Sequence, residues 1–138
     1  MSKWRREFIN RFPEFRHAAQ EANYAGALMQ RPLFFVLRDA IDRGDTVAVD
    51  NVMSYVQWLK ANPSVTCATE IEEDLLVPIL ASNRLRAGFL QQLTSEHFAQ
   101  IKNHCVEAWR SDDERNAKLQ ALELEFKALQ REKKPRAE

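Results

Sequence analysis

The stretch that decides the fold is residues 45–80, DTVAVDNVMSYVQWLKAN (45–62) followed by PSVTCATEIEEDLLVPIL (63–80). Its first half repeats apolar residues at the i, i+3, i+4, i+7 spacing of a helix face that packs on a core. That stripe consists of Val49, Val52, Met53, Val56 and Leu59. The two halves join at Asn62-Pro63, a capping residue followed by proline, which is typical of a helix start. The stretch therefore predicts two consecutive helices.

Two aromatic residues of the first helix lie away from this stripe. Successive helical residues are about 100° apart, which puts Trp58 nearly opposite the centre of the stripe and Tyr55 on its flank. A neighbouring helix can cover such residues, because tryptophan is usually at least partly buried. If they are exposed, they make good interface anchors, because Trp and Tyr dominate binding hot spots. We assign Tyr55 and Trp58 to a partner-binding surface, with burial in the core as the alternative.

The second helix carries four acidic residues almost in a row: Glu70, Glu72, Glu73 and Asp74. A run of charges is usually a solvated helix face. As an interaction patch it would favour a cationic partner, because like charges packed this closely repel one another. Asp39 and Asp42 would add to the patch if their helix lies alongside. We include all six acidic residues in the predicted partner-binding site.

Length and composition favour one soluble domain. The chain has 138 residues, of which 45% are hydrophobic and 29% are charged, and 20 basic residues balance 20 acidic ones. A balanced chain gives no electrostatic reason to bind nucleic acid. No apolar run approaches the ~20 residues that span a bilayer, and the N-terminus lacks the apolar segment of a secretory signal. With only two cysteines, a disulfide framework is not expected. We predict a cytoplasmic protein without membrane or nucleic-acid partners.

The fold class predicted is all-α, because glycine is scarce, strand-like alternation is absent and strong helix formers dominate. Capping residues, prolines and apolar spacing predict helices over residues 2–12, 13–28, 32–43, 46–62, 63–80, 83–93, 95–109 and 112–132. Pro78 predicts a kink or stop between Asp74 and Ala81. Gly44 is expected to end the third helix and Asp45 to cap the fourth.

We expect an irregular bundle of about six to eight helices, arranged as a stack of helical hairpins. The predicted single domain covers residues 1–132, with a core over 2–110, a long C-terminal helix over 112–132 and a frayed tail over 133–138. The last helix repeats apolar residues at coiled-coil spacing but over too few heptads for a coiled coil. This seam, expected to pack on the domain or on a partner, consists of Leu119, Leu122, Phe126 and Leu129.

No catalytic or cofactor motif is present. The chain has no phosphate-binding glycine loop, no C-x-x-C and no H-E-x-x-H. His97, His104 and Cys105 form the nearest metal candidate, but the two histidines lie seven residues apart, about two helical turns, which is far for joint ligation. A basic N-terminal patch is diluted by Glu7 and Glu14, which argues against an RNA site. We predict no enzyme activity, no cofactor and no metal.

The succession EFINRFPEF (7–15), PLFFVLRDAI (32–41) and residues 50–80 resembles a family of small bacterial all-helical proteins, known as a domain of unknown function. Its members begin with an F-P-E motif and a leading helix pair, and continue with F-[IV]-E-x-[LM] and V-x-x-x-[LIV]-E-x-L helices. The resemblance covers about residues 7–93. It departs at Gln57, where the family often has Glu, and at Pro78, which replaces a late acidic residue.

Some members of that family are immunity proteins of polymorphic toxins, such as Rhs and type VI secretion toxins. The resemblance therefore implies an intracellular protein that binds a cognate toxin and occludes its active site. Toxins that act on nucleic acid or nucleotides generally have basic active-site clefts, which an acidic helix could occupy. The alternative is a non-enzymatic helical adaptor or regulatory protein that dimerises through the C-terminal helix.

Overall fold

The computed structural model describes residues 1–62, 67–108 and 112–133, and their side chains except at 103–108, 112–116 and 133. Within these residues it is all-α and contains no strand, as predicted. The elements are α1 (Lys3–Arg11), η1 (Pro13–Phe15), α2 (Arg16–Glu21), η2 (Met29–Leu33), α3 (Phe34–Arg43), α4 (Thr46–Ala61), α5 (Ala68–Glu70), η3 (Ile71–Leu76), α6 (Val77–Ala81), α7 (Asn83–Gln92), α8 (Ser95–Ala108) and α9 (Asp112–Lys133).

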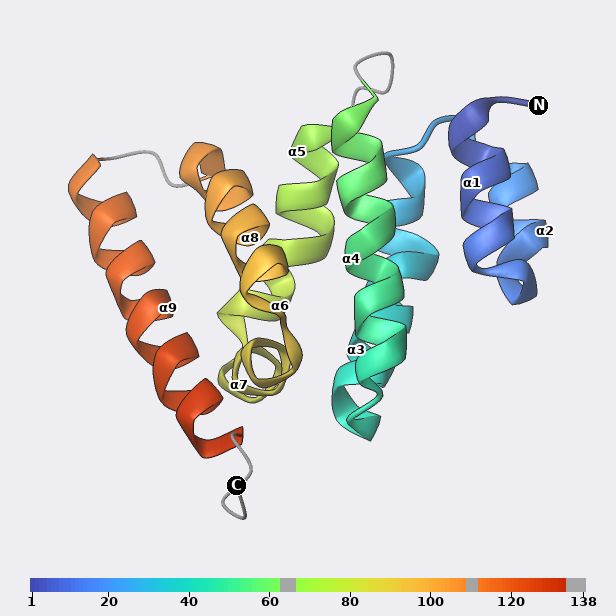
Figure 1. Cartoon of the computed structure of the whole chain (residues 1–138). Coiled ribbons are helices and arrows are strands. Elements are labelled where there is room, and N and C mark those ends of the chain that lie inside the picture. The colour runs from blue at the N-terminus through green and yellow to red at the C-terminus, as the bar shows by residue number, and fades with distance from the viewer. Residues whose placement is uncertain (63–66, 109–111, 134–138) are drawn as a thin grey trace.

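Figure 1 shows the helices following one another across the molecule, from α1 and α2 at one end to α9 at the other. Helix α4 lies between the N-terminal helices and the rest, and it packs against both α3 and α1. All five residues of its predicted apolar stripe are buried. No helix in the described part of the chain is both long and apolar enough to cross a membrane.

The turn between α3 and α4 forms as its residues predict. Gly44 has φ 66°, in the left-handed region that favours glycine. The Asp45 carboxylate accepts a hydrogen bond from the Ala48 N–H at 3.1 Å, which satisfies one of the unpaired amides of the first helical turn. Both expectations for this turn are confirmed.

Replacing Asp45 with alanine is expected to lower the free energy of unfolding by about 1 kcal/mol, because α4 loses its capping acceptor. Urea denaturation followed by circular dichroism measures this loss. Asn at position 45 keeps an acceptor and is an equally good cap, so Asp45→Asn should stay close to the wild-type stability. If both variants lose stability equally, charge rather than capping is responsible.

The N-terminal helices depart from one expectation. The helix predicted over 13–28 ends much earlier, because Ala22 is extended (φ −70°, ψ 131°) and α2 stops at Glu21. The Arg5 guanidinium donates from Nε to the Ala19 carbonyl at 2.9 Å and from a terminal nitrogen to the Ala22 carbonyl at 2.7 Å. A side chain of α1 therefore satisfies carbonyls at the C-terminal end of α2, where a helix leaves them unpaired.

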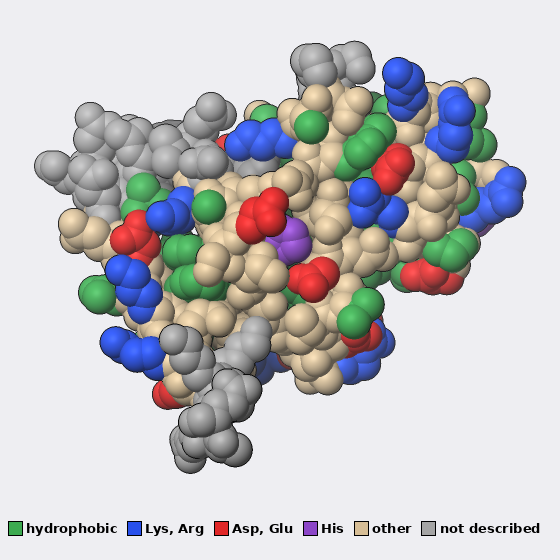
Figure 2. All heavy atoms as spheres, viewed as in Figure 1, with side chains coloured by type: hydrophobic (Ala, Val, Ile, Leu, Met, Phe, Trp, Pro, Cys, Tyr) green, Lys and Arg blue, Asp and Glu red, His purple; other side chains and the backbone are tan. Residues whose placement is uncertain are grey.

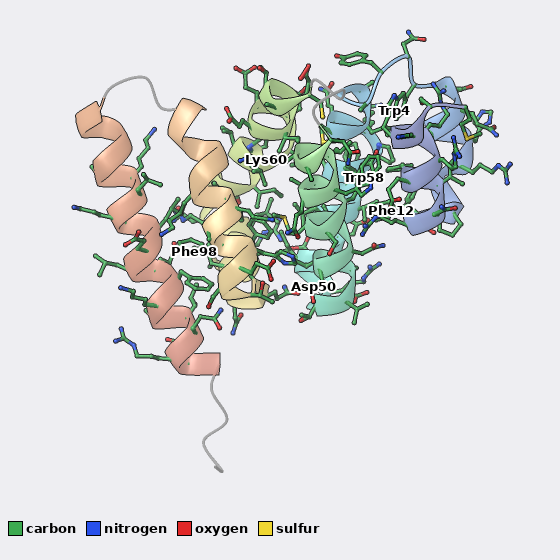
Figure 3. The ribbon with its side chains drawn as sticks, turned by 45° about the horizontal axis from the view of Figure 1, so that its top comes forward. Trp4, Phe12, Asp50, Trp58, Lys60 and Phe98 are labelled. Atoms are coloured by element: carbon green, nitrogen blue, oxygen red, sulfur yellow. The ribbon has the colours of Figure 1, made fainter. Side chains whose placement is uncertain are left out.

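An aromatic cluster of α1 and α4 residues joins the N-terminal helices to the rest of the molecule. Phe8 and Phe12 are buried and lie edge-on to Tyr55, with ring centroids 5.5 and 6.2 Å from it. The Tyr55 hydroxyl donates to the Trp4 carbonyl at 2.9 Å. Trp58 stacks on Tyr55, with ring centroids 6.2 Å apart. Figure 3 shows Trp4, Phe12 and Trp58 at this junction.

The helix over 68–81 is interrupted before Pro78, over Ile71–Leu76, which starts earlier than the expected range of Asp74 to Ala81, and the helix stops at Ala81, inside that range. The interruption is a π turn, η3, in which the Val77 N–H donates to the carbonyl of Glu72, five residues earlier. Proline lacks an N–H, and in a regular helix its ring clashes with the carbonyl four residues earlier. The wider turn before Pro78 keeps that carbonyl away from the ring. The helix resumes as α6 and ends at Ala81, where Ser82 caps α7 by accepting from the Leu85 N–H.

The apolar seam of the last helix packs on its own domain. Leu122 and Phe126 are buried against α7 and α8. Phe126 stacks on Phe98 of α8 with ring centroids 4.1 Å apart, and Figure 3 shows Phe98 between the two helices. Several predictions fall outside the described residues or side chains. They are the helix starts at Asn62-Pro63 and Ser111, the predicted inner positions Cys105, Ala108 and Trp109, and the tail after Lys133.

Candidate partner-binding site

One surface pocket lies where the start of α3 meets η3. Its volume is about 310 Å³, and it is lined by Gln30, Arg31, Phe34, Phe35, Glu73, Asp74 and Pro78. These residues come from two segments about forty positions apart in the sequence, which meet because η2 packs against η3. The pocket combines the aromatic rings of Phe34 and Phe35 with the Arg31 guanidinium and the carboxylates of Glu73 and Asp74.

Local backbone geometry places the two sides of this pocket. Arg31 is extended (φ −146°, ψ 126°) because the residue before a proline avoids the α region, and α3 follows directly after Pro32 and Leu33. On the other side, Ile71, Leu75 and Ile79 point into the core. Residues on the opposite side of that helix, Glu73 and Asp74, are therefore turned toward α3.

Phe35 is the aromatic centre of the site. It is 37% exposed, which makes it one of the exposed large hydrophobic residues of the described part of the chain. The guanidinium groups of Arg31 and Arg38 lie 5.6 and 4.8 Å from its ring centroid, within the range of cation–π attraction. Phe34 packs edge-on against it at 5.5 Å. Arg and aromatic residues held together at a surface are typical of protein interfaces.

The carboxylates of this surface lack ion-pair partners. Within the described part of the chain, no Lys, Arg or His nitrogen lies within ion-pair distance of Glu70, Glu73 or Asp74. Most other described acidic residues do have such partners: Glu7, Glu21, Asp39, Asp42, Asp45, Asp50, Glu123 and Glu125. The negative charge of Glu70 also affects a buried group. Together with burial, it raises the pKa of the Cys67 thiol to about 11.

Gly26 extends the surface toward a second exposed aromatic. A Cβ atom at Gly26 would come within 2.5 Å of the Tyr24 ring and 2.7 Å of the Glu70 side chain. Both side chains therefore lie directly over this glycine, and Tyr24 is 52% exposed. We define the acidic–aromatic face as this group together with the pocket residues above: Tyr24, Phe34, Phe35, Glu70, Glu73 and Asp74.

Gly26→Ala is expected to displace Tyr24 and Glu70 while changing the free energy of unfolding by less than about 1 kcal/mol. The added methyl group meets a ring carbon of Tyr24 and the Cγ and Cδ atoms of Glu70, and it is accommodated when these exposed or half-buried side chains move. Two-dimensional NMR should show shifts confined to the acidic–aromatic face, with an almost unchanged melting temperature.

Gly88→Ala is the matched control. There the new methyl group would lie 2.7 Å from the side chain of Ile41, which is buried between α3 and α7. Overpacking of this kind costs about 1 to 3 kcal/mol, so this variant should melt at a clearly lower temperature. Equal destabilisation of the two variants would contradict the placement of Tyr24 and Glu70 at the surface.

Two of the predicted site residues are buried and are corrected here. Tyr55 has no exposed surface, because α1 covers that side of α4, so the alternative of burial in the core applies. Glu72 is only 6% exposed. The helix turns about 100° per residue, which places Glu72 among Ile71, Leu75 and Leu76 on the inner side. Neither residue belongs to a partner-binding surface.

The other predicted residues are distributed over three places. Glu70, Glu73 and Asp74 come together on the acidic–aromatic face. Trp58 is half-buried against the core beside Tyr55. Asp39 and Asp42 lie on α3 but are paired, with Arg38 at 3.6 Å and with Arg84 of α7. The predicted site residues therefore do not form one surface. Of the six acidic residues predicted for the site, only Glu70, Glu73 and Asp74 lie on the acidic–aromatic face.

The sequence interpretation missed the aromatic half of the site. Phe35 lies about 180° around the helix from the centre of the apolar face formed by Leu33, Leu37 and Ala40, so the helical spacing already marked it as outward-facing. Nothing comparable marked Tyr24. It meets Glu70 only because of the packing of η2 against η3, which the spacing of a single helix cannot indicate.

The described residues hold no group of three or more His, Cys, Asp or Glu side chains that could bind a metal ion. His97 is buried with Nδ1 3.6 Å from an Asp50 oxygen, and each of these two atoms lacks a hydrogen-bond partner. Figure 2 shows Lys and Arg side chains over the N-terminal helices and over α9 at the other end, with acidic side chains among them. Two of these basic residues are engaged within the protein, since Arg5 binds carbonyls of α2 and Arg11 pairs with Glu7 at 2.7 Å.

Comparison of the chain with protein-family models, with curated proteins and with solved structures gave no match. The resemblance to a family that contains immunity proteins therefore stays a prediction, and the acidic–aromatic face is interpreted from its own chemistry.

Proposed function

We propose that this protein is an immunity protein, which neutralises a cognate bacterial toxin by binding it and occluding its active site. The observation that carries the proposal is the set of carboxylates without ion-pair partners, Glu70, Glu73 and Asp74, beside the exposed rings of Phe35 and Tyr24. The partner is a toxin domain with a basic active-site cleft. The protein itself contributes no chemistry, cofactor or metal, and it acts in the cytoplasm, where the toxin would otherwise act.

The physical argument rests on complementarity. Three carboxylates close together on one surface repel one another, and a cationic partner relieves that repulsion as it binds. Electrostatic attraction of this kind mainly speeds association. The aromatic rings supply the apolar area that slows dissociation, since a few aromatic and arginine side chains usually dominate binding energy. The face offers both, and the pocket between Phe35 and Asp74 can accept a protruding side chain.

The alternative, an adaptor that dimerises through the C-terminal helix, is less well supported. Most of the seam that would form such a dimer is occupied: Leu122 and Phe126 are buried against α7 and α8, and Leu129 packs partly buried on the core, whereas Leu119 is only half-buried. Among the α9 residues whose side chains the structure describes, Leu124 is the only large hydrophobic residue that is exposed. A single leucine gives little apolar area for a stable dimer.

The first test is co-purification of the tagged protein from its native host, followed by mass spectrometry. A toxin domain recovered in stoichiometric amount supports the proposal. Recovery of a housekeeping complex, or of this protein alone under conditions where the toxin is expressed, would contradict it.

The second test is charge reversal on the acidic–aromatic face, measured as the affinity for the recovered toxin domain. The triple variant Glu70→Lys/Glu73→Lys/Asp74→Lys should bind about 100-fold more weakly or worse, since losing charged contacts at an interface costs roughly 2 to 5 kcal/mol. The matched control, Glu14→Lys/Glu96→Lys/Glu132→Lys, changes the net charge equally at exposed positions elsewhere. Equal losses in the two variants would mean that only net charge matters and would exclude this face.

A further inference from the structure

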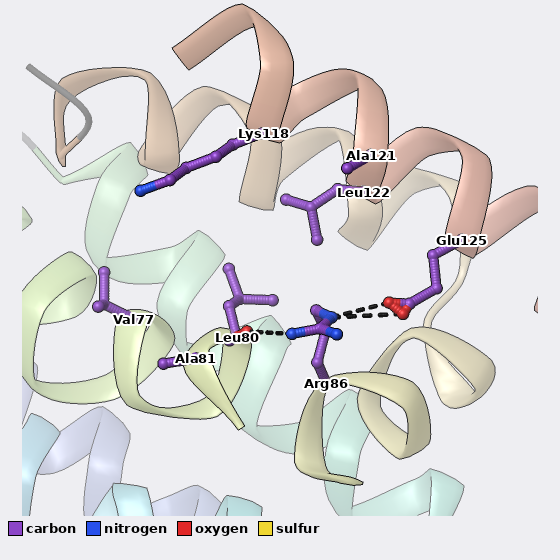
Figure 4. A pocket seen from close by; sticks show the side chains of 8 residues that line it. All are labelled: Val77, Leu80, Ala81, Arg86, Lys118, Ala121, Leu122 and Glu125. Atoms are coloured by element: carbon purple, nitrogen blue, oxygen red, sulfur yellow. Dashed lines mark hydrogen bonds and ion pairs between the residues drawn. The ribbon is translucent and has the colours of Figure 1, made fainter. Parts of the chain in front are cut away.

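A second cavity lies under the last helix. Pro78 lines the pocket described above, whereas its neighbours Val77, Leu80 and Ala81 line a separate cavity between α6, α7 and α9. Its volume is about 320 Å³, near the lower end of the range of small-molecule sites. Figure 4 shows this cavity with the residues that surround it.

The cavity exists because small residues face it from two helices. The second half of α9 is fixed to the domain, since Phe126 stacks on Phe98 of α8 with ring centroids 4.1 Å apart. Where α9 passes α6, the lining residues Ala121 and Ala81 have only methyl side chains. These side chains are too short to fill the space between the two helices, so the cavity stays open.

The charged residues around the cavity are engaged within the protein. The Arg86 guanidinium donates to the Glu125 carboxylate at 2.7 Å and to the Leu80 carbonyl at 2.9 Å, and Figure 4 shows these bonds at one end of the cavity. Lys118, the other cation of the lining, has an interaction partner of its own. Among the described residues that line the cavity, no charge is therefore left to select an ionic ligand.

The cavity offers apolar surface to a ligand. Most of its lining is aliphatic and comes from α6 and α9: Val77, Leu80, Ala81, Ala121 and Leu122. A water molecule held there needs about two to four hydrogen-bonding partners, and the charged groups of the lining are already engaged. An apolar molecule that displaces poorly held water gains affinity. It also restores the dispersion contacts that empty space between apolar walls forfeits.

We infer that this cavity binds a compact, uncharged apolar molecule such as a small aromatic hydrocarbon, a ligand that nothing in the proposed immunity function requires. An apolar cavity of about 150 Å³ is enough to bind benzene, and this cavity is larger. A charged ligand of the same size is disfavoured, because it would give up hydration without gaining a free partner of opposite charge. A compact ligand also has no chain with which to keep a charged group in water while its apolar part is inside.

Toluene, benzoate and benzylamine are the probes, because they share one aromatic ring and differ in charge at neutral pH. Their binding to the full chain is measured by titration followed with two-dimensional NMR. Toluene should bind at least about 10-fold more tightly than either charged analogue, since only the charged analogues lose hydration that the cavity does not replace. The largest shifts should lie in α6, α7 and the part of α9 around Ala121. Benzoate or benzylamine that binds as tightly as toluene would overturn the assignment of an uncharged ligand.

The location of the site is tested by filling the cavity. Ala121→Trp places an indole in the cavity lining, and Leu124→Trp places one on the same helix outside the lining, where Leu124 is 70% exposed. Toluene binding should be lost in the first variant and kept in the second, with unchanged circular dichroism spectra in both. Binding that survives Ala121→Trp, or no toluene binding to the wild-type protein, would overturn the proposal. Toxin affinity is measured separately, so failure here leaves the proposed function intact.

Discussion

Replacing Phe8 with alanine is expected to lower the free energy of unfolding by about 3 to 5 kcal/mol, the usual range for a buried phenylalanine. Phe8 has no exposed surface and lies between Phe12 and Tyr55, with ring centroids 5.0 and 5.5 Å away. Its removal leaves a void at the junction where α1 packs on α4. Domains of this size are stabilised by only about 5 to 15 kcal/mol, so the variant should unfold at much lower urea concentration.

The matched control is Tyr24→Ala, which removes a large aromatic side chain at an exposed position. Surface substitutions usually change stability by no more than about 0.5 kcal/mol. Both variants are followed by circular dichroism and by tryptophan fluorescence, which reports Trp4 and Trp58 at the affected junction. Similar stability of the two variants would contradict the central position of Phe8.

The second large effect is expected at alkaline pH. Burial raises the pKa of Tyr55 well above its ordinary value of 10.0, and it raises the pKa of Cys67 from 9.0 to about 11. Each group is neutral when protonated, so the folded protein keeps its proton at a pH where the unfolded chain has released it. The free energy of unfolding therefore falls as pH rises, by up to about 1.4 kcal/mol per pH unit for each group.

This loss begins near pH 9 for Cys67 and near pH 10 for Tyr55, and it is absent at neutral pH. Urea denaturation at pH 8, 9, 10 and 11 measures it. Other groups also titrate in this range, so the informative quantity is the difference in slope between the wild type and Tyr55→Phe. That variant loses the hydrogen bond to the Trp4 carbonyl, about 1 kcal/mol, but its stability should fall less steeply above pH 10. Equal slopes would show that Tyr55 is accessible to solvent in the folded state.

Local features of the fold could be predicted from the sequence, because they depend on a few neighbouring residues. Gly44 and Asp45 specify the turn between α3 and α4 almost by themselves, and the stripe from Val49 to Leu59 identifies the inner face of α4. The inward position of Glu72 was predictable too, from its angular place among Ile71 and Leu75, although its charge suggested exposure.

Features that depend on a second helix could not be predicted in the same way. The spacing along α4 shows that Tyr55 lies off the main stripe, but not that α1 returns to cover it. The candidate site was predictable only in its acidic half for the same reason. Tyr24 and Glu70 meet over Gly26 across more than forty residues of sequence, and only the packing of η2 against η3 brings them together.

The π turn at Ile71–Leu76 makes this segment unusually sensitive to the loss of a single codon. An i→i+5 turn holds one residue more than an α-helical turn, so deleting Glu73 would leave enough residues for a regular helix. The ring of Pro78 would then meet a carbonyl that the wider turn now keeps away from it. The helical turn that carries Glu70 would also rotate by about 100° relative to α6, and with the rest of the packing unchanged this would carry Glu70 away from Tyr24. Point substitutions at this surface are therefore tolerable where a one-residue deletion is not.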